Sequence, residues 1–225
     1  MAVALVNTGI TGKSAGLGTT VTLSTTLTAG ANLLVIFTYN YNGANACTGV
    51  TYNNVAMTEH VSKIHDNFGG MARVKMWYLE NPSTSSAYNI VATWAGAGSY
   101  DKHIAGASFS GYGSIGTGYS NSAPTNSTSA NPSVTVSDWA SGDYAVGGVI
   151  MMYSSPTTGD TLIASDFSGS NDDTYSNCAY QTADGNLNWT SSAAAWAAVG
   201  AAIKPSSSSS APKSLFEPRV IGIMT

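Results

Sequence analysis

Charged residues are scarce in this chain of 225 residues, because Asp, Glu, Lys and Arg together make up only 9% of it. A soluble domain usually has about 25%. The formal net charge is −4, and the sequence contains no cluster of Lys and Arg. Binding to nucleic acid needs such clusters to displace the counterions of the phosphates. We therefore expect no nucleic-acid partner, and few charged groups are left for catalysis.

Long apolar runs are also lacking. No segment is apolar over the length that is needed to cross a bilayer. The apolar start Ala2–Val6 is too short for a secretory signal and has no basic flank. We therefore expect a protein that is made in the cytoplasm without a signal peptide and that has no membrane partner.

Cysteine is rare, with only Cys47 and Cys178 in the chain. Two interpretations are open: one long-range disulfide, or two separate thiols that are packed as small apolar groups. In either case most of the stability must come from the burial of apolar side chains, which make up 43% of the sequence.

Histidine is equally rare, and the three histidines suggest no metal site or catalytic centre. His60 and His65 could meet His103 at a metal, but their spacing fits no strong zinc pattern. Residues five apart in a strand also face opposite sides. Gly9–Ser14 has the ending of a phosphate-binding loop without its first glycine or its helix, and the acidic segment Asp166–Asp173 lacks the bidentate glutamate of a calcium loop. We expect no catalytic residue, no metal and no cofactor.

Strand patterns fill the middle of the chain. The segment Gly49–Thr58 predicts two short strands around a turn at Asn53–Asn54, because asparagine tolerates the positive φ of two-residue hairpin turns. Another strand contains Met76 and is ended by Pro82, which has no N–H for the ladder. Alternation over 88–94 predicts a strand with one buried face. That face carries Tyr88, Ile90, Ala92 and Trp94.

Two runs, Leu33–Phe37 and Val149–Met152, are apolar at every position. We expect these strands to cross the middle of a sandwich, where both of their faces stay dry. The alternating segments between clusters of Gly, Asn, Ser and Pro number about ten, as is typical of sandwiches and jelly rolls. The predicted fold is therefore all-β: an antiparallel, jelly-roll-like β-sandwich of about ten strands with an extended C-terminal tail.

Two segments are less regular. In Ser191–Ile203, Trp196 and Val199 lie at helical spacing with Ile203, and alanine favours helix. A helix without charge on any face would need complete burial, so we predict a strand. Gly111–Asn131 is mostly Gly, Ser, Thr and Asn, and it predicts a surface loop that is available for contacts.

The composition changes at the C-terminal end. Residues 1–204 form the predicted sandwich domain, residues 205–213 form a linker that is rich in Ser and Pro, and residues 214–225 form an apolar tail. So short a tail cannot fold alone and needs a surface on its own domain or on a neighbouring subunit. The residues expected to dock are Leu215, Phe216, Val220, Ile221, Ile223 and Met224.

Tyrosines near asparagines suggest a glycan site. Tyr39, Tyr41, Tyr112 and Tyr119 could stack on sugar rings while amides bind the hydroxyls. Tyrosine at a strand end also commonly covers the core of a sandwich and keeps its hydroxyl in water. Both interpretations stay open at this point.

Five segments combine into a pattern of short strands and turns: Leu33–Phe37, Gly49–Thr58, Met76–Pro82, Asn89–Thr93 and Ala105–Ser110. Through them the chain resembles a broad family of β-sandwich domains that are found in bacteriophage virion proteins and bacterial surface proteins. The resemblance spans Val3–Lys204 and rests on structural motifs. The second turn residue is often glycine in this family, whereas Asn54 stands there in this chain.

The resemblance implies a non-enzymatic virion structural protein, most directly a head decoration or a fibre-type component. Its apolar tail would anchor it to other virion subunits, and homo-oligomers would be natural. The alternative is a carbohydrate-binding or adhesive module on the extracellular surface. Such a module would take part in host attachment through a glycan of the host surface.

Overall fold

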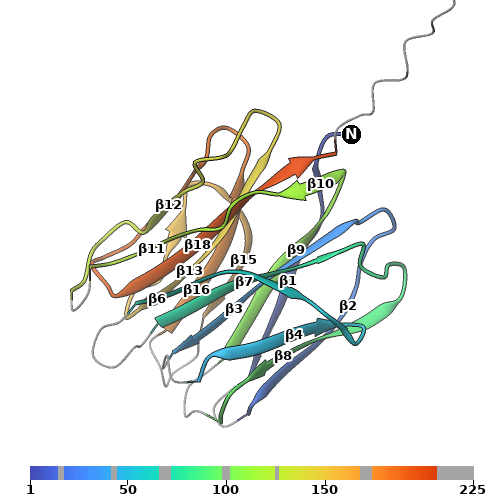
Figure 1. Cartoon of the computed structure of the whole chain (residues 1–225). Helices are drawn as coiled ribbons and strands as arrows, with labels where there is room; N and C mark the ends of the chain where they lie inside the picture. The colour runs from blue at the N-terminus through green and yellow to red at the C-terminus, as the bar shows by residue number, and fades with distance from the viewer. Residues whose placement is uncertain are drawn as a thin grey trace, which may run out of the picture.

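The computed structural model of the chain is built from β-strands and turns (Figure 1). It describes residues 1–14, 18–41, 45–65, 72–97, 102–124, 127–167 and 174–206. Within these ranges there are eighteen strands and no helix, and therefore no helix that could span a membrane. The prediction of an antiparallel all-β fold is confirmed. The expected number of about ten strands was too low, because strands of two to four residues show no recognisable alternation.

Two central sheets form the middle of the molecule. The first has the strand order β1 (Ala4–Ser14), β9 (Lys102–Ser110), β3 (Leu33–Tyr41), β7 (Ala72–Glu80) and β6 (Thr58–His65). The second has the order β10 (Tyr112–Ile115), β18 (Trp196–Pro205), β13 (Tyr144–Met152), β16 (Thr174–Gln181) and β15 (Thr161–Phe167), and β11 (Tyr119–Ser122) also pairs with β18.

Each central sheet is covered on its outer face by a smaller sheet. The first is covered by β2 (Thr20–Thr26), β8 (Ala87–Trp94), β4 (Cys47–Tyr52) and β5 (Val55–Ala56). The second is covered by β12 (Ser133–Thr135), β17 (Asn186–Thr190) and β14 (Thr157–Thr158). The expected sandwich of two facing sheets therefore carries a further sheet on each outer face.

Three apolar cores separate these four layers, and β3 shows why its sequence is apolar throughout. Leu33, Val35 and Phe37 point into the core between the two central sheets. Leu34 and Ile36 point into the core under the first outer sheet. A strand with apolar neighbours on both faces cannot alternate with polar residues. The prediction that the runs 33–37 and 149–152 cross the middle is confirmed.

The second half of the chain repeats the topology of the first. Strands β1–β9 form one central and one outer sheet, and β10–β18 form the other pair in the same relative order. In this correspondence β3 matches β13, β7 matches β16, β6 matches β15 and β9 matches β18. The contacts between the halves are reciprocal, since β6 packs on β18 and β11 while β15 packs on β9 and β1. Such reciprocity is what a two-fold axis generates.

One row of residues is identical in the two halves. In the first half the register aligns Ala107, Val35, Tyr78 and Thr58 across β9, β3, β7 and β6. In the second half it aligns Ala201, Val146, Tyr180 and Thr161 across β18, β13, β16 and β15. The two central sheets are therefore equivalent in register as well as in strand order.

The edge strand of each half is interrupted at the same place. Register shifts in β1 lie between Leu5 and Ile10, where Gly9 has a φ of 70°. In the second half the edge divides into β10 and β11, which are separated by residues 116–118. The interrupted edge shows that Gly111–Asn131 is not the predicted surface loop. Its first part supplies the edge strands that satisfy the backbone of β18.

Three local predictions are confirmed. Asn53 and Asn54 have φ values of 49° and 61°, as a two-residue hairpin turn between β4 and β5 requires. Strand β7 ends at Glu80, two residues before Pro82. The ambiguous segment near the C-terminus forms β18, which is buried from Trp196 to Ile203.

Candidate functional site

The four tyrosines that were predicted to bind glycan do not come together. Tyr39 is completely buried and donates a hydrogen bond from its hydroxyl to the Asn177 carbonyl at 3.2 Å. Because its ring lies in the core, the prediction that it stacks on a sugar was wrong. Tyr41 lies on the same end of β3 and packs against the same core.

The other two tyrosines lie elsewhere. Tyr112 is 8% exposed, and it lies beside the opposite end of β3, where its carbonyl accepts a hydrogen bond from Asn32. Its hydroxyl donates to Glu80 at 2.6 Å. Tyr119 lies on β11 and packs on the core of the second outer sheet. A shared platform of these four rings is therefore absent from the fold, because burial and strand register separate them.

The three histidines are also apart. The ring of His60 meets that of Tyr78 at 5.7 Å. His65 is buried beside the Pro124 carbonyl at 3.3 Å, and His103 is buried with its Nδ1 3.2 Å from Oγ of Ser176. Within the described ranges, His, Cys, Asp and Glu nowhere gather in a group of three or more that could hold a metal ion.

The two cysteines are free and buried in different cores. Cys47 lies under the first outer sheet, and Cys178 lies between the central sheets. Of the two interpretations that the sequence left open, the structure has the separate thiols. The six predicted docking residues of the tail, and the linker beyond Ser206, lie outside the described residues. Pro205, the first residue of the expected linker, is the last residue of β18.

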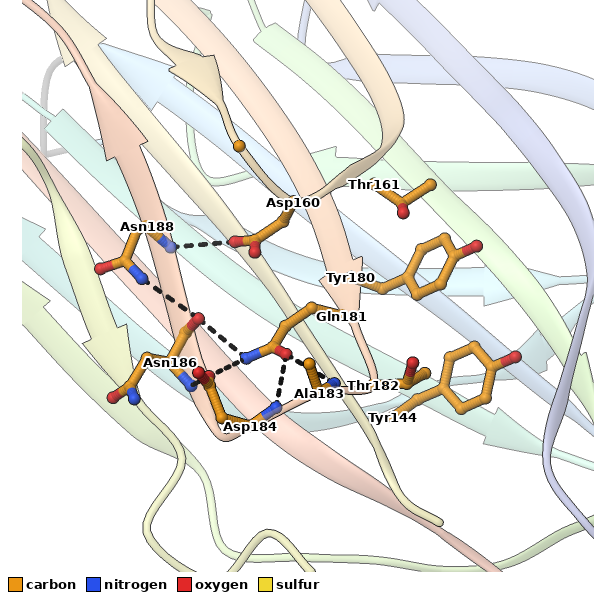
Figure 2. A pocket seen from close by; sticks show the side chains of 11 residues that line it. Tyr144, Asp160, Thr161, Tyr180, Gln181, Thr182, Ala183, Asp184, Asn186 and Asn188 are labelled. Atoms are coloured by element: carbon orange, nitrogen blue, oxygen red, sulfur yellow. Dashed lines mark hydrogen bonds between the residues drawn. The ribbon is translucent and has the colours of Figure 1, made fainter. Parts of the chain in front are cut away.

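A depression of about 440 Å³ lies between the β14–β15 turn and the β16–β17 turn (Figure 2). Polar side chains on one side of it include Asp160, Asp184, Asn186 and Asn188. The rings of Tyr144 and Tyr180 line it on the other side of Gln181. The depression therefore combines hydrogen-bonding groups with aromatic carbon, as small-molecule sites commonly do.

Gln181 holds one wall of this depression in place. Its Nε2 donates to Oδ1 of Asp184 and, at 2.8 Å, to the carbonyl of Asn186. Its Oε1 accepts from the N–H groups of Ala183 and Asp184 at 2.9 and 2.8 Å. One buried amide thus satisfies four partners in the β16–β17 turn, so the turn is preorganised rather than shaped by a ligand.

Asp160 comes from the β14–β15 turn and lies on the same polar side of the depression as Asn188 and Asp184. Its Oδ2 accepts the backbone N–H of Asn188 at 3.0 Å. The hydroxyl of Thr158 is a second hydrogen-bonding neighbour of this carboxylate. Burial, together with the nearby charge of Asp184, raises the pKa of the Asp160 carboxyl, although the hydrogen bond from Asn188 opposes this. The backbone hydrogen bond from Asn186 and the amide of Gln181 lower the pKa of Asp184. Since a carboxylate has about four acceptor sites, Asp160 can still accept a hydrogen bond from a ligand hydroxyl.

The tyrosine pair belongs to a row of three rings. Phe109 meets Tyr144 edge-to-face at 5.9 Å, and Tyr144 stacks on Tyr180 at 5.2 Å with an interplanar angle of 24°. Tyr180 is the last ring of the row. In the equivalent place of the first half, Leu33 stands where the second half has Tyr144. Packing alone therefore does not require an aromatic residue at this position.

No protein-family model, curated protein or solved structure matches the chain. The interpretation of the depression as a binding site is therefore based on its geometry alone. Sequence reasoning missed it because its walls come from two turns that the strand order brings together. The one local signal is Asp184-Gly185, a dipeptide that favours a tight hairpin turn between β16 and β17.

Proposed function

We propose that this chain is a non-enzymatic structural module of a bacteriophage particle, a head decoration or fibre-type component that is anchored to neighbouring subunits through its C-terminal segment. The observation that carries the proposal is the position of Met1 beside Ser206, the last described residue. The ammonium of Met1 donates to the carbonyl of Ser206 at 3.0 Å, and the N–H of Ser206 donates to the Gly111 carbonyl at 2.8 Å.

In this proposal the β-body is attached at the corner where Met1 and Ser206 meet. In Figure 1 the N-terminus lies beside the end of β18. A body held from one corner leaves its other surfaces free, which suits a displayed module. The four-layer packing supports the same role, because strands that are buried on both faces make a rigid body. The other virion subunits, including further copies of this chain, are the proposed partners.

Deletion of residues 207–225 tests the anchor, because this cut keeps β18 and the contact between Met1 and Ser206 intact. We expect the truncated protein to fold with an unchanged melting temperature and to fail to join assembled particles. A matched variant, Ser208→Gly with Ser209→Gly, changes the linker without removing the apolar tail and should be incorporated normally. Normal incorporation of the truncated protein would refute the anchor.

The second candidate function is carbohydrate binding, and the depression at Asp160 and Tyr180 specifically favours it. Carboxylate and amide groups bind hydroxyls, and an aromatic ring covers the apolar face of a sugar. The acidic residues favour neutral over acidic sugars, since anionic ligands would be repelled. We expect Tyr180→Ala to abolish retention on a glycan array and Tyr153→Ala, an exposed tyrosine outside the depression, to leave it unchanged. Retention that survives Tyr180→Ala would exclude this site.

A further inference from the structure

The duplication of the fold places a second depression at the equivalent position of the first half. The second-half depression contains the pair Thr161 and Tyr180, which face each other across β15 and β16. The first half has the same pair as Thr58 and Tyr78, across β6 and β7. A separate depression of about 230 Å³ lies there, lined by Thr58, Tyr78, Leu79 and Glu80.

We infer that the chain carries two carbohydrate sites, one in each half, and that together they bind a neutral polysaccharide with a repeating unit. This inference rests on the carbohydrate function proposed above. It assigns the first-half site to Thr58, Tyr78 and Glu80, and the second-half site to Thr161, Tyr180 and Asp160.

Each site presents a tyrosine ring that a second ring holds in place. Tyr180 is held by Tyr144, and Tyr78 is held by His60 at 5.7 Å with an interplanar angle of 87°. A ring that is already fixed loses little conformational freedom when a sugar packs against it. Thr58 and Thr161 are both exposed beside their tyrosines, and each adds a hydroxyl that can donate or accept.

Each site also has a carboxylate that a neighbouring residue holds by a hydrogen bond. Oε1 of Glu80 accepts the hydroxyl of Tyr112 at 2.6 Å, and Oδ2 of Asp160 accepts the N–H of Asn188 at 3.0 Å. The Asp160 carboxylate also has the hydroxyl of Thr158 as a hydrogen-bonding neighbour. A carboxylate offers about four acceptor sites, so both carboxylates can still accept a ligand hydroxyl. A carboxylate that is held in this way has a fixed orientation toward a ligand hydroxyl. The two halves reach this arrangement with different residues, so the row of identical residues does not by itself produce it.

Two sites on one rigid body favour a polymeric ligand. A polymer that is long enough to reach both sites presents its second repeating unit at high effective concentration, so its total affinity exceeds that of either site. The negative charge at both sites disfavours uronic and sialic acid polymers. The ligand class that fits is therefore a neutral repeating polysaccharide.

Nuclear magnetic resonance titration of the full chain tests the inference. The probes are maltotriose, lactose and N,N′-diacetylchitobiose, with polysialic acid as the anionic control. We expect one neutral probe to shift amide signals around both Tyr78 and Tyr180, and the anionic control to shift neither. Thr58→Trp should fill the first-half depression and remove only the Tyr78 set, and Thr161→Trp should remove only the Tyr180 set. Both threonines are exposed, so the fold should survive.

The outcomes separate the two proposals. Shifts around only one of the tyrosines would overturn the inference of paired sites and leave carbohydrate binding standing. The absence of shifts with all three neutral probes would overturn both. As a further control, Tyr153→Ala removes an exposed tyrosine that lies outside both depressions and should change neither set of shifts.

Discussion

The ring of Phe37 lies directly over the backbone of Gly148 in the core between the two central sheets. A Cβ atom on Gly148 would lie 2.8 Å from Cδ1 of Phe37 and 2.6 Å from the hydroxyl oxygen of Tyr39. Phe37 and Gly148 occupy the same position of the two halves, two residues after Val35 and Val146. The large residue of the first half thus packs against the small residue that occupies the equivalent position of the second half.

Gly148→Ala tests this packing. Neither the Phe37 ring nor the buried Tyr39 can move away freely, so we expect the variant to lose about 1–3 kcal/mol of unfolding free energy. Gly49→Ala is the matched control, because a Cβ there would meet nothing within 4 Å. Denaturant unfolding of both variants measures the difference. Equal stability of the two would show that the core tolerates an added methyl group at Gly148.

The duplication explains what the sequence could and could not predict. Alternation identified β8, and the continuous apolar runs identified β3 and β13, because each pattern follows from the faces that a strand buries. The repeat escaped notice because most equivalent positions keep the packing role and not the residue, as with Phe37 and Gly148. The second outer sheet was recognised only in part, because a strand of two residues such as β14 has too few positions to show a period.

The candidate site was less predictable than the fold. The sequence suggested that tyrosine rings could stack on sugars, but Tyr39 and Tyr112 are buried in the core. Only the strand register shows which tyrosines remain at the surface. Tyr180 pairs with Thr161 across two strands, and Asp160 arrives from a different turn. Neither relation is local in the chain, so no spacing in the sequence could reveal it.

The stability effect of a substitution in the hairpin turn Asn53–Asn54 should depend on how well the new residue tolerates a positive φ. Both residues have positive φ, which glycine adopts without cost and a β-branched residue adopts only with strain. We expect Asn54→Gly to keep the unfolding free energy within about 0.5 kcal/mol and Asn54→Val to lower it by about 1–2 kcal/mol. Thermal unfolding of both variants gives the comparison. A stable Asn54→Val protein would mean that the turn relaxes at little cost.

The two thiols should be inert in the folded protein. Burial raises the pKa of the Cys178 thiol to about 12 and also raises the pKa of Cys47, so neither forms the reactive thiolate near neutral pH. We expect iodoacetamide to leave both unmodified in the native state and to alkylate both in denaturant without prior reduction. Mass spectrometry counts the added groups. A mass that shows no alkylation until a reductant is added would reveal a disulfide.

Asp138 should stabilise the fold at neutral pH by fixing the interrupted edge of the second half. Its Oδ2 accepts the N–H of Thr117 at 3.0 Å and lies 3.4 Å from Nζ of Lys204. Burial raises the pKa of this carboxyl, but these two partners outweigh burial and lower its pKa below the ordinary value of an aspartate. The stabilisation is therefore present above the unfolded pKa and is lost as pH falls through the lower folded pKa.

The variant Asp138→Asn should accordingly lose about 1 kcal/mol of unfolding free energy at about pH 6, and its deficit should shrink toward about pH 2.5. Asp160→Asn is the matched control with the opposite sign, because the pKa of Asp160 is raised. Above the unfolded pKa the charged Asp160 destabilises the fold, so Asp160→Asn should lose no unfolding free energy at about pH 6. As the pH falls and Asp160 is protonated, the unfolding free energy of wild type should rise relative to that of the variant. Urea unfolding at a series of pH values measures both differences. If the stability difference from wild type changed with pH in the same direction for both variants, the opposite pKa shifts of Asp138 and Asp160 would be contradicted.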